Sequence, residues 1–193
     1  MSRYFPLALE LEGRSCVVLG NGSEAVRRAS ALIEAGARVD LVAEAATDEL
    51  RALSRQHGLS LKEQRPSSSD LDGRWLAVFS ERDPALALEL GAAANEKRVW
   101  FCAVDDPRAS NYAHMAQARA GLVTVAVSTS GKAPALGRRL AEELRRVFDG
   151  AGLAAFAEKL AELRERTASP DRGRVLGDAV ADVKFDGDLR LPK

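Results

Sequence analysis

Apolar residues follow two different periods along the first hundred positions. Short, mainly apolar runs predict strands at 16–19, 39–43, 59–61, 75–79 and 99–104, and a continuous apolar run such as 75–79 is typical of a strand buried on both faces of a sheet. Between them, apolar residues recur at helical spacing, which predicts helices at 24–35, 46–57 and 84–97. Strands that alternate with helices predict an α/β fold, here an N-terminal Rossmann-type parallel sheet with helices on both faces.

The pattern changes after about residue 112. One more strand is expected at 122–127, followed by a polar turn and a helix at 133–148. The apolar stripe of this helix comprises Leu136, Leu140, Leu144 and Val147, and a second amphipathic helix carries Leu153, Phe156, Leu160 and Leu163. Two such stripes exceed what one small appendage can bury, so we expect a homodimer. The predicted regions are 1–112, an NAD-binding Rossmann domain, 113–149, a dimerisation region, and 150–193, a small, mainly helical C-terminal region.

Composition narrows the class of protein. The 193 residues carry 28 basic and 28 acidic side chains, so the net positive charge typical of a nucleic-acid-binding protein is absent. Two separated cysteines and two histidines give no framework for a metal site and indicate a reducing compartment. No apolar run approaches the length of a membrane span, and the first residues lack the apolar core of a signal peptide. We therefore expect a cytoplasmic enzyme without a resident metal.

A glycine motif lies between the first predicted strand and helix. Gly20, Asn21, Gly22, Ser23, Glu24 and Ala25 form G-x-G-x-x-A. In this context the first glycine permits a tight turn, the second lets the backbone approach a pyrophosphate, and the alanine allows close packing of helix on strand. Free N–H groups at the start of the helix, near Ser23, would bind the phosphates. The motif predicts dinucleotide binding, although it can also be a plain structural turn.

The end of the second strand bears on the choice of cofactor. A carboxylate there often holds the ribose hydroxyls of NAD, but this strand ends at Val42 and Ala43, and Glu44 is the next carboxylate. Glu44 could serve if the strand ends one residue later. No Arg or Lys stands there for a 2′-phosphate, which favours NAD over NADP.

Two further segments could carry chemistry. Asp105 and Asp106 directly follow a buried strand. A carboxylate at such a strand end can act as a general base or hold a metal ion. Equally, Asp-Asp-Pro is a good turn sequence and needs no further function. The stretch from Ser128 to Lys132 precedes a helix and suits an anion, or it forms a cap cluster with a solvated lysine. His114 is a proton carrier or an ordinary surface histidine, and Cys102 is a small buried hydrophobe. Some basic residues that flank these turns could meet substrate carboxylates: Arg27, Arg28, Lys132, Arg138 and Arg139.

With these segments in view, the chain resembles the dehydrogenase/ferrochelatase module of siroheme synthases, including stand-alone precorrin-2 dehydrogenases. Four stretches carry the resemblance, and their order and spacing agree with the family across about 150 residues. They are Tyr4 to Leu7, Val17 to Arg28, Val104 to Pro107 and Val125 to Leu136. The last, V-A-V-S-T-S-G-K-A-P-A-L, is the most specific.

The resemblance implies a concrete activity. The family uses NAD⁺ to oxidise the tetrapyrrole precorrin-2 to sirohydrochlorin, and many members then insert Fe²⁺ to give siroheme. Its members are usually dimers with a Rossmann domain, a dimerisation region and a small helical C-terminal domain. The family's key aspartate falls on Asp105, which could accept a proton if partial burial favours its protonated form. The family's serine/threonine turn falls on Ser128 and Thr129, and we expect the substrate-binding residues to be these two together with Lys132, Asp106 and His114.

The chain also departs from the family. Ser80, Glu81, Arg82 and Asp83 replace the family's A-T-[DN]-[DN] beside the cofactor, and Ser80 and Glu81 are the expected contacts there. Asn111 to Met115 lack a family proline. Two alternatives stay open: a non-catalytic NAD-binding sensor, which needs no Asp105 or C-terminal half, and a degenerate member kept as an assembly subunit.

Overall fold

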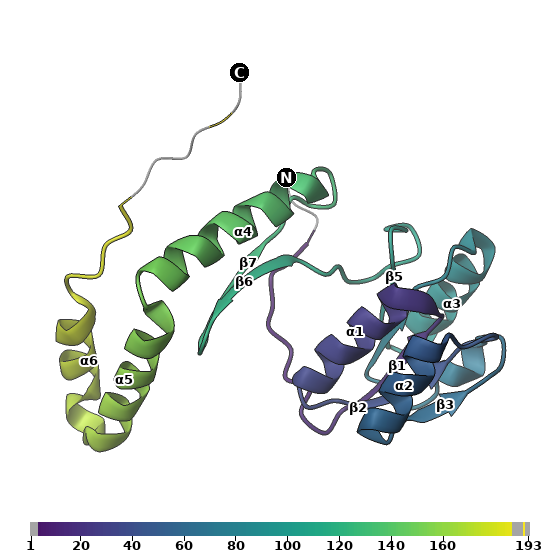
Figure 1. Ribbon diagram of the computed structural model, residues 1–193, viewed down its shortest axis with the longest axis horizontal. Coiled ribbons are helices and arrows are strands. Elements are labelled where there is room, and N and C mark those ends of the chain that lie inside the picture. The colour runs from purple at the N-terminus through teal and green to yellow at the C-terminus, as the bar shows by residue number, and fades with distance from the viewer. Residues whose placement is uncertain (1–3, 187–190, 192–193) are drawn as a thin grey trace. The chain divides into compact units, whose positions relative to one another are not determined.

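The computed structural model describes residues 4–186 and residue 191. The chain forms two compact units, which divide between His114 and Met115 (Figure 1). The further division of the second half into a dimerisation region and a C-terminal region stays a prediction.

The first unit contains a five-stranded sheet in which every pairing is parallel. The strands are β1 (Ser15–Leu19), β2 (Arg38–Val42), β3 (Ser60–Lys62), β4 (Leu76–Phe79) and β5 (Trp100–Ala103). Their order across the sheet is β3-β2-β1-β4-β5, so the direction of winding reverses between β1 and β4. This order is that of a Rossmann fold, and it confirms the predicted fold class.

Helices cover both faces of this sheet. They are α1 (Gly22–Glu34), α2 (Asp48–His57) and α3 (Pro84–Glu96), with a 3₁₀ turn, η1, at Ser68–Leu71. Successive residues of β1 point to opposite faces, as the twofold period of a strand requires. Val18 packs with α1 and α2 in one buried cluster, whereas Val17 and Leu19 pack with α3 in another.

Local capping sets where two of these helices begin. The hydroxyl of Thr47 accepts a hydrogen bond from Leu50 N at 3.4 Å, so α2 begins at Asp48 and not at residue 46 as predicted. The Asp83 carboxylate caps α3 by accepting from Leu86 N at 3.0 Å, with Pro84 in the first turn. Within residues 80–83, Asp83 therefore supplies a helix cap.

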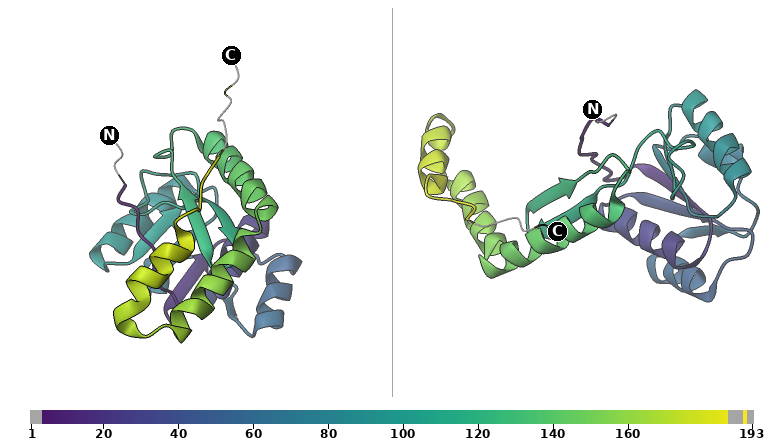
Figure 2. Two further views of the ribbon diagram at one scale, coloured as in Figure 1. Left: turned by 90° about the vertical axis from the view of Figure 1, so that its left-hand side faces the viewer. Right: turned by 90° about the horizontal axis from the view of Figure 1, so that it is seen from above.

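The second unit begins with an antiparallel hairpin of β6 (Ala116–Ala120) and β7 (Val123–Val127). It continues with α4 (Pro134–Gly150), α5 (Leu153–Arg166), η2 (Ser169–Asp171) and α6 (Arg172–Val180). The hairpin packs along α4 (Figure 2), and the buried residues of this contact are Ala118, Ala120, Ala141 and Phe148. Neither β6 nor α6 was predicted. The alternation A-Q-A-R-A in β6 has a strand's period, but its apolar members are small.

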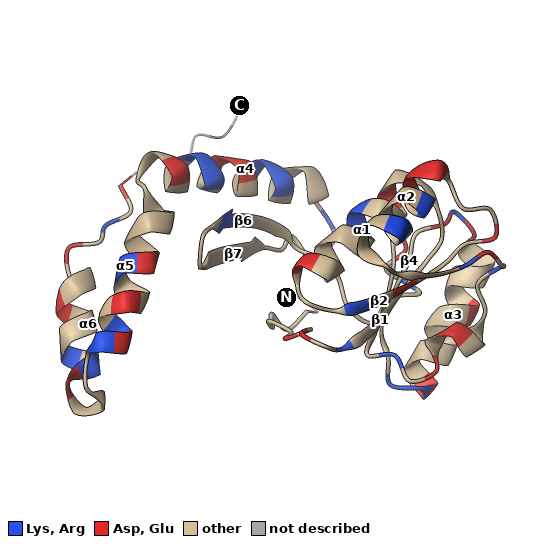
Figure 3. Cartoon of the chain, turned by 60° about the horizontal axis from the view of Figure 1, so that its bottom comes forward, with Lys and Arg blue, Asp and Glu red and all other residues tan. Residues whose placement is uncertain are grey.

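Much of the apolar surface of the second unit is not covered by the unit itself. Leu136 and Val147 on α4 are each 46% exposed, and α5 contains no fully buried residue. Basic and acidic residues alternate along α4 and α5 (Figure 3), and some of them pair, as Arg139 does with Glu143. No helix of the described residues is long and apolar enough to span a membrane.

Candidate functional site

The carboxyl ends of the parallel strands meet at one edge of the sheet. Leu19 of β1 is in register with Val42 of β2 and Phe79 of β4, and Phe79 is in register with Ala103 of β5. The segments that directly follow these strands therefore lie at the same edge. They contain the predicted cofactor residues from Gly20, Ala43 and Ser80 onward and the predicted catalytic Asp105. Ligands of open α/β sheets bind at this edge, where the strand order reverses.

The two glycines of the motif are required for different structural reasons. Gly20 has a φ of +126°, and a Cβ there would lie 2.5 Å from Ser80 Oγ and 2.8 Å from Glu81 Cγ. Only glycine therefore fits between β1 and β4. Gly22 begins α1 with a φ of +73°, yet a Cβ there would meet no protein atom within 4 Å. The protein leaves open space at Gly22, which is what close approach of a pyrophosphate needs.

Asn21 joins this turn to the loop after β2. Its Oδ1 accepts hydrogen bonds from Gly22 N and Thr47 N, both at 2.8 Å, and its Nδ2 donates to the carbonyl of Ala45. The Gly22 N–H is thus engaged, so the backbone donors of α1 that stay without intrahelical partners begin at Ser23, as expected. The Asn21 side chain therefore ties the glycine turn to the loop after β2.

Carboxylates gather where the ribose of a dinucleotide would lie. β2 ends at Val42, so the predicted contacts Ala43 and Glu44 lie in the loop that follows it. Burial raises the pKa of Glu81, and the negative charges of Glu44 and Asp83 raise it further. Glu44 and Glu81 are therefore close enough to repel one another, and an added phosphate would meet the same field.

Asp105 lies on a strained turn directly after β5. Its φ of +62° places it in the left-handed region, which aspartate tolerates better than most residues. The Ser110 side chain holds the turn by accepting from Ala103 N at 3.0 Å and donating to the carbonyl of Asp106 at 2.8 Å. The Asp105 side chain is exposed and has no hydrogen-bond partner among the described residues. The partial burial that the sequence argument required is thus not provided by this unit alone.

Asp106 has a different environment from its neighbour. Its carboxylate accepts three hydrogen bonds from Arg108, two from the guanidinium and one from the backbone N–H, all at 3.1 Å. The side-chain hydrogen bonds from Arg108 are the main reason that the pKa of Asp106 is lowered. Asp106 therefore stabilises the turn, and the neighbouring Asp105 keeps its carboxylate available.

A pocket of about 690 Å³ opens at this edge of the sheet. Three segments line it: Glu24 of α1, the stretch from Ser80 to Pro84 with Ala87, and the stretch from Ala103 to Arg108. It brings predicted cofactor contacts (Glu24, Ser80 and Glu81) together with Asp105 and Asp106. Its volume is within the range of small-molecule and cofactor sites. Arg82, Pro107 and Arg108 also line it, and the sequence offered no signal for them beyond their neighbours.

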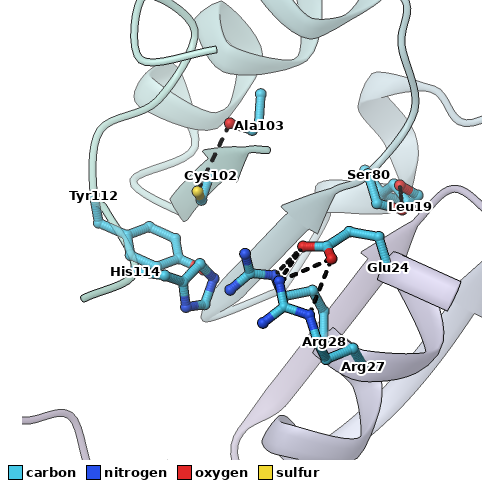
Figure 4. Close-up of polar contacts among 9 residues, drawn as sticks. All are labelled: Leu19, Glu24, Arg27, Arg28, Ser80, Cys102, Ala103, Tyr112 and His114. Carbon is cyan, nitrogen blue, oxygen red and sulfur yellow. Dashed lines mark hydrogen bonds and ion pairs between the residues drawn. The ribbon is translucent and has the colours of Figure 1, made fainter. Parts of the chain in front are cut away.

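A charged and aromatic cluster adjoins the pocket through Glu24 (Figure 4). The Glu24 carboxylate pairs with Arg27 at 2.6 Å and Arg28 at 2.8 Å. Both guanidinium groups reach towards His114, whose Nε2 lies 3.1 Å from the Tyr112 hydroxyl. Removal of the ring from water, followed by the Arg28 and Arg27 cations, lowers the pKa of His114 to about 4, although the residue as a whole is exposed. His114 is therefore neutral at pH 7.

Neither cysteine is available for chemistry. Both are buried, and burial raises the pKa of Cys16 to about 11 and also raises the pKa of Cys102. They pack as small hydrophobic residues, as expected for Cys102. No group of three or more His, Cys, Asp or Glu side chains in the described part of the chain is arranged to hold a metal ion.

The predicted substrate turn belongs to the second unit. Ser128 Oγ accepts from Ser130 N and Thr129 Oγ1 accepts from Ala133 N, each at 3.2 Å, and Lys132 is exposed. The hydroxyls thus shape the turn, and α4 begins at Pro134 without a side-chain cap. These residues stay predicted substrate contacts.

The comparisons with known proteins agree with this geometry. Residues 7–116 match the family model described as "Putative NAD(P)-binding". The chain belongs to this NAD(P)-binding family, and a nicotinamide dinucleotide is the cofactor that the family match and the strand–turn–helix geometry support.

The relatives narrow the class. The chain is 36% identical over 177 residues to a siroheme synthase of Gluconacetobacter diazotrophicus, covering 89% of this chain and 37% of that one. It is 33% identical over 141 residues to a siroheme synthase of Citrobacter koseri, covering 73% and 31%. It therefore spans about a third of the length of these curated relatives. The solved structure of SirC, precorrin-2 dehydrogenase, matches its fold with a TM-score of 0.79 at 23% identity, over 93% of this chain and 90% of that one. The resemblance to the dehydrogenase module of siroheme synthases is confirmed.

Proposed function

We propose that this chain oxidises precorrin-2 to sirohydrochlorin with NAD⁺ as the oxidant. The observation that carries the proposal is the position of Asp105. Its carboxylate has no hydrogen-bond partner among the described residues, it lies on a strained turn at the end of β5, and it shares one pocket with contacts from the glycine turn. Backbone strain and an unpaired carboxylate at a strand end are features of functional sites. A sensor needs neither.

The residues of the glycine turn fit a dinucleotide. Gly22 leaves space for the pyrophosphate, and the backbone N–H groups of Ser23 and Glu24 are donors at the start of α1. When bound, the nicotinamide ring supplies the acceptor for a hydride. The tight fit of Gly20 against Ser80 and Glu81 holds the turn after β1 against the segment after β4.

The acidic residues favour NAD⁺ over NADP⁺. A 2′-phosphate adds close to two negative charges, and it would lie near Glu44 and Glu81. Burial, and then the negative charge of Glu44, already raise the pKa of Glu81. The loop that follows β2, from Ala43 to Thr47, contains no basic residue to compensate. These carboxylates would therefore disfavour the phosphorylated cofactor relative to NAD⁺.

Asp105 would accept the proton that leaves the substrate. Oxidation removes a hydride and a proton from precorrin-2, so the reaction yields sirohydrochlorin, NADH and H⁺. The exposed carboxylate can receive the proton directly and pass it to water. Closure of the pocket by substrate and cofactor would supply the burial that the first unit does not give to Asp105.

The test compares two isosteric substitutions. Asparagine tolerates the left-handed backbone of residue 105, so Asp105→Asn should fold and bind NAD⁺ as the wild type does. Its kcat should fall by roughly a hundredfold, the typical share of a general base. Asp106→Asn is the comparison, since an amide oxygen still accepts from Arg108 N, and its kcat should fall much less than that of Asp105→Asn. Equal kcat values for wild type and Asp105→Asn would remove Asp105 from the mechanism.

The second unit would complete the enzyme as a homodimer. The half-exposed apolar stripe on α4 and the absence of any buried residue on α5 support an interface there. Ser128, Thr129 and Lys132 would contribute polar contacts to the substrate. Insertion of Fe²⁺ as a second substrate stays a prediction from the family resemblance.

A further inference from the structure

We propose that Arg28, assisted by Arg27, binds a carboxylate of the substrate and so determines specificity for an anionic tetrapyrrole. This inference rests on the proposed function, and it concerns the cluster beside the pocket and not the pocket itself. Neither residue is among the predicted cofactor contacts.

The two guanidinium groups differ in how many of their donors are already used. Arg28 donates only its Nε to Glu24, at 2.8 Å, and Arg27 donates its Nε and one Nη to the same carboxylate. Both Nη atoms of Arg28 have no acceptor among the described residues, and no fully buried side-chain nitrogen there lacks a partner. The Nη atoms of Arg28 therefore reach solvent with their donors unused. Planar guanidinium donors of this kind match a carboxylate in bidentate geometry.

The cluster of Glu24, Arg27, Arg28 and His114 carries a net positive charge that is partly buried. One carboxylate, Glu24, faces two guanidinium groups, and His114 is neutral at pH 7, so the cluster keeps one net positive charge. The Arg28 side chain is only 15% exposed, against 63% for Arg27. A charge that is largely removed from water interacts more strongly with an arriving anion than a solvated surface charge does. Arg28 is thus the principal contact and Arg27 the outer one.

Two aromatic rings lie beside the guanidinium groups. The rings of Tyr112 and His114 meet edge to face, with centroids 5.1 Å apart (Figure 4). Arg28 lies near both rings and near Cys102, since its cation affects the pKa values of all three side chains. An aromatic wall next to an anion site suits a flat ring system that carries a carboxylate arm.

The same geometry favours the substrate carboxylate, and not a phosphate of the cofactor, as the ligand of Arg28. The Arg28 guanidinium faces Tyr112 and His114, beside β5, whereas the loop expected to hold the adenosine lies on the opposite side of β1, after β2. Glu24 lines the pocket that contains Asp105. A carboxylate held by Arg28 would therefore direct the substrate ring towards Asp105.

The test measures turnover of precorrin-2 in three variants. Arg28→Met keeps the packed stem and removes the charge, Arg28→Lys keeps the charge and removes the fork, and Arg55→Met is the control. Arg55 is an exposed residue of α2 with no partner among the described residues. The KM for precorrin-2 should rise roughly ten- to a hundredfold in Arg28→Met, the value of a hydrogen bond to a charged group. It should rise less in Arg28→Lys and stay unchanged in Arg55→Met, while the Kd for NAD⁺ stays within about twofold throughout.

A binding measurement separates the remaining outcomes. Sirohydrochlorin should bind Arg28→Met more weakly than wild type in calorimetry, whereas its fully esterified form, which lacks the negative charges, should bind both proteins equally. A loss of NAD⁺ affinity with an unchanged KM for precorrin-2 would assign the arginine to a cofactor phosphate and overturn the inference. An unchanged KM and Kd in folded Arg28→Met would also overturn it and leave the proposed function intact. A wild-type chain that binds NAD⁺ but neither binds nor oxidises the tetrapyrrole would overturn both.

Discussion

Replacing Gly22 by alanine should separate cofactor binding from folding. Gly22 has a φ of +73°, and a Cβ there meets no protein atom within 4 Å. The stability cost is therefore that of the left-handed backbone alone, about 1–2 kcal/mol. For a chain of this length that cost lowers the Tm by about 2–4 °C per kcal/mol.

The binding cost comes from the pyrophosphate that would occupy the same space. Overpacking by one methyl group costs about 1–3 kcal/mol, which corresponds to a roughly 5- to 150-fold rise in the Kd for NAD⁺. The matched control is Gly58→Ala. Gly58 has a φ of +63° and the same open space, but it precedes β3, at the other edge of the sheet.

Calorimetric titration of both variants with NAD⁺, together with thermal unfolding, decides the matter. Both variants should lose similar stability, and only Gly22→Ala should lose affinity. Equal affinity in the wild type and the two variants would refute the assignment of the pyrophosphate to this turn.

Four further predictions follow from the same geometry. Gly20→Ala should destabilise the chain more than Gly22→Ala in thermal unfolding, because its Cβ adds contacts of 2.5 and 2.8 Å to an unfavourable φ; equal Tm values would contradict the packing at β4. Glu44→Lys should raise the affinity for NADP⁺ relative to NAD⁺ in parallel titrations, and an unchanged ratio would remove Glu44 from the ribose site. The pKa of His114 is lowered from 6.5 to about 4, so between these pH values the unfolded chain binds a proton that the folded chain does not, and the free energy of unfolding falls as the pH falls. In urea unfolding over this pH range, His114→Asn should therefore lose less stability than the wild type or Tyr112→Phe. Equal losses in all three proteins would contradict this. Light scattering should give a dimer at micromolar concentration and a monomer for Phe156→Lys on α5, whereas a wild-type monomer would exclude the proposed interface.

The fold could be predicted because its first half is repetitive and local. The central strands β1 and β4 are short apolar runs, β2 has apolar residues at Val39, Leu41 and Val42, and each helix has one apolar face, so the spacing of apolar residues separates strands from helices. The glycine motif could be assigned to a turn because both glycines follow such a run. The second half was harder, since β6 uses alanine where strands usually carry large apolar residues, and α6 contains two glycines at Gly173 and Gly177.

The site was only partly predictable, because its decisive features depend on partners distant in sequence. Asp105 and Asp106 are equivalent by composition, and only the hydrogen bonds from Arg108 and the backbone of the turn distinguish them. Likewise, the sequence placed Asn21 in the turn but did not show that its side chain would reach Ala45 and Thr47.

The most direct test of the proposed function measures the ratio of NADH to sirohydrochlorin formed in one reaction. The purified chain is incubated anaerobically with precorrin-2 and NAD⁺, and the absorbances of NADH and sirohydrochlorin are followed together. The account predicts that both products appear in equal amounts, at a much lower rate in Asp105→Asn and with far less product when NADP⁺ replaces NAD⁺. A chain that binds NAD⁺ but forms neither product would contradict the proposal and identify a nucleotide-binding module without this activity.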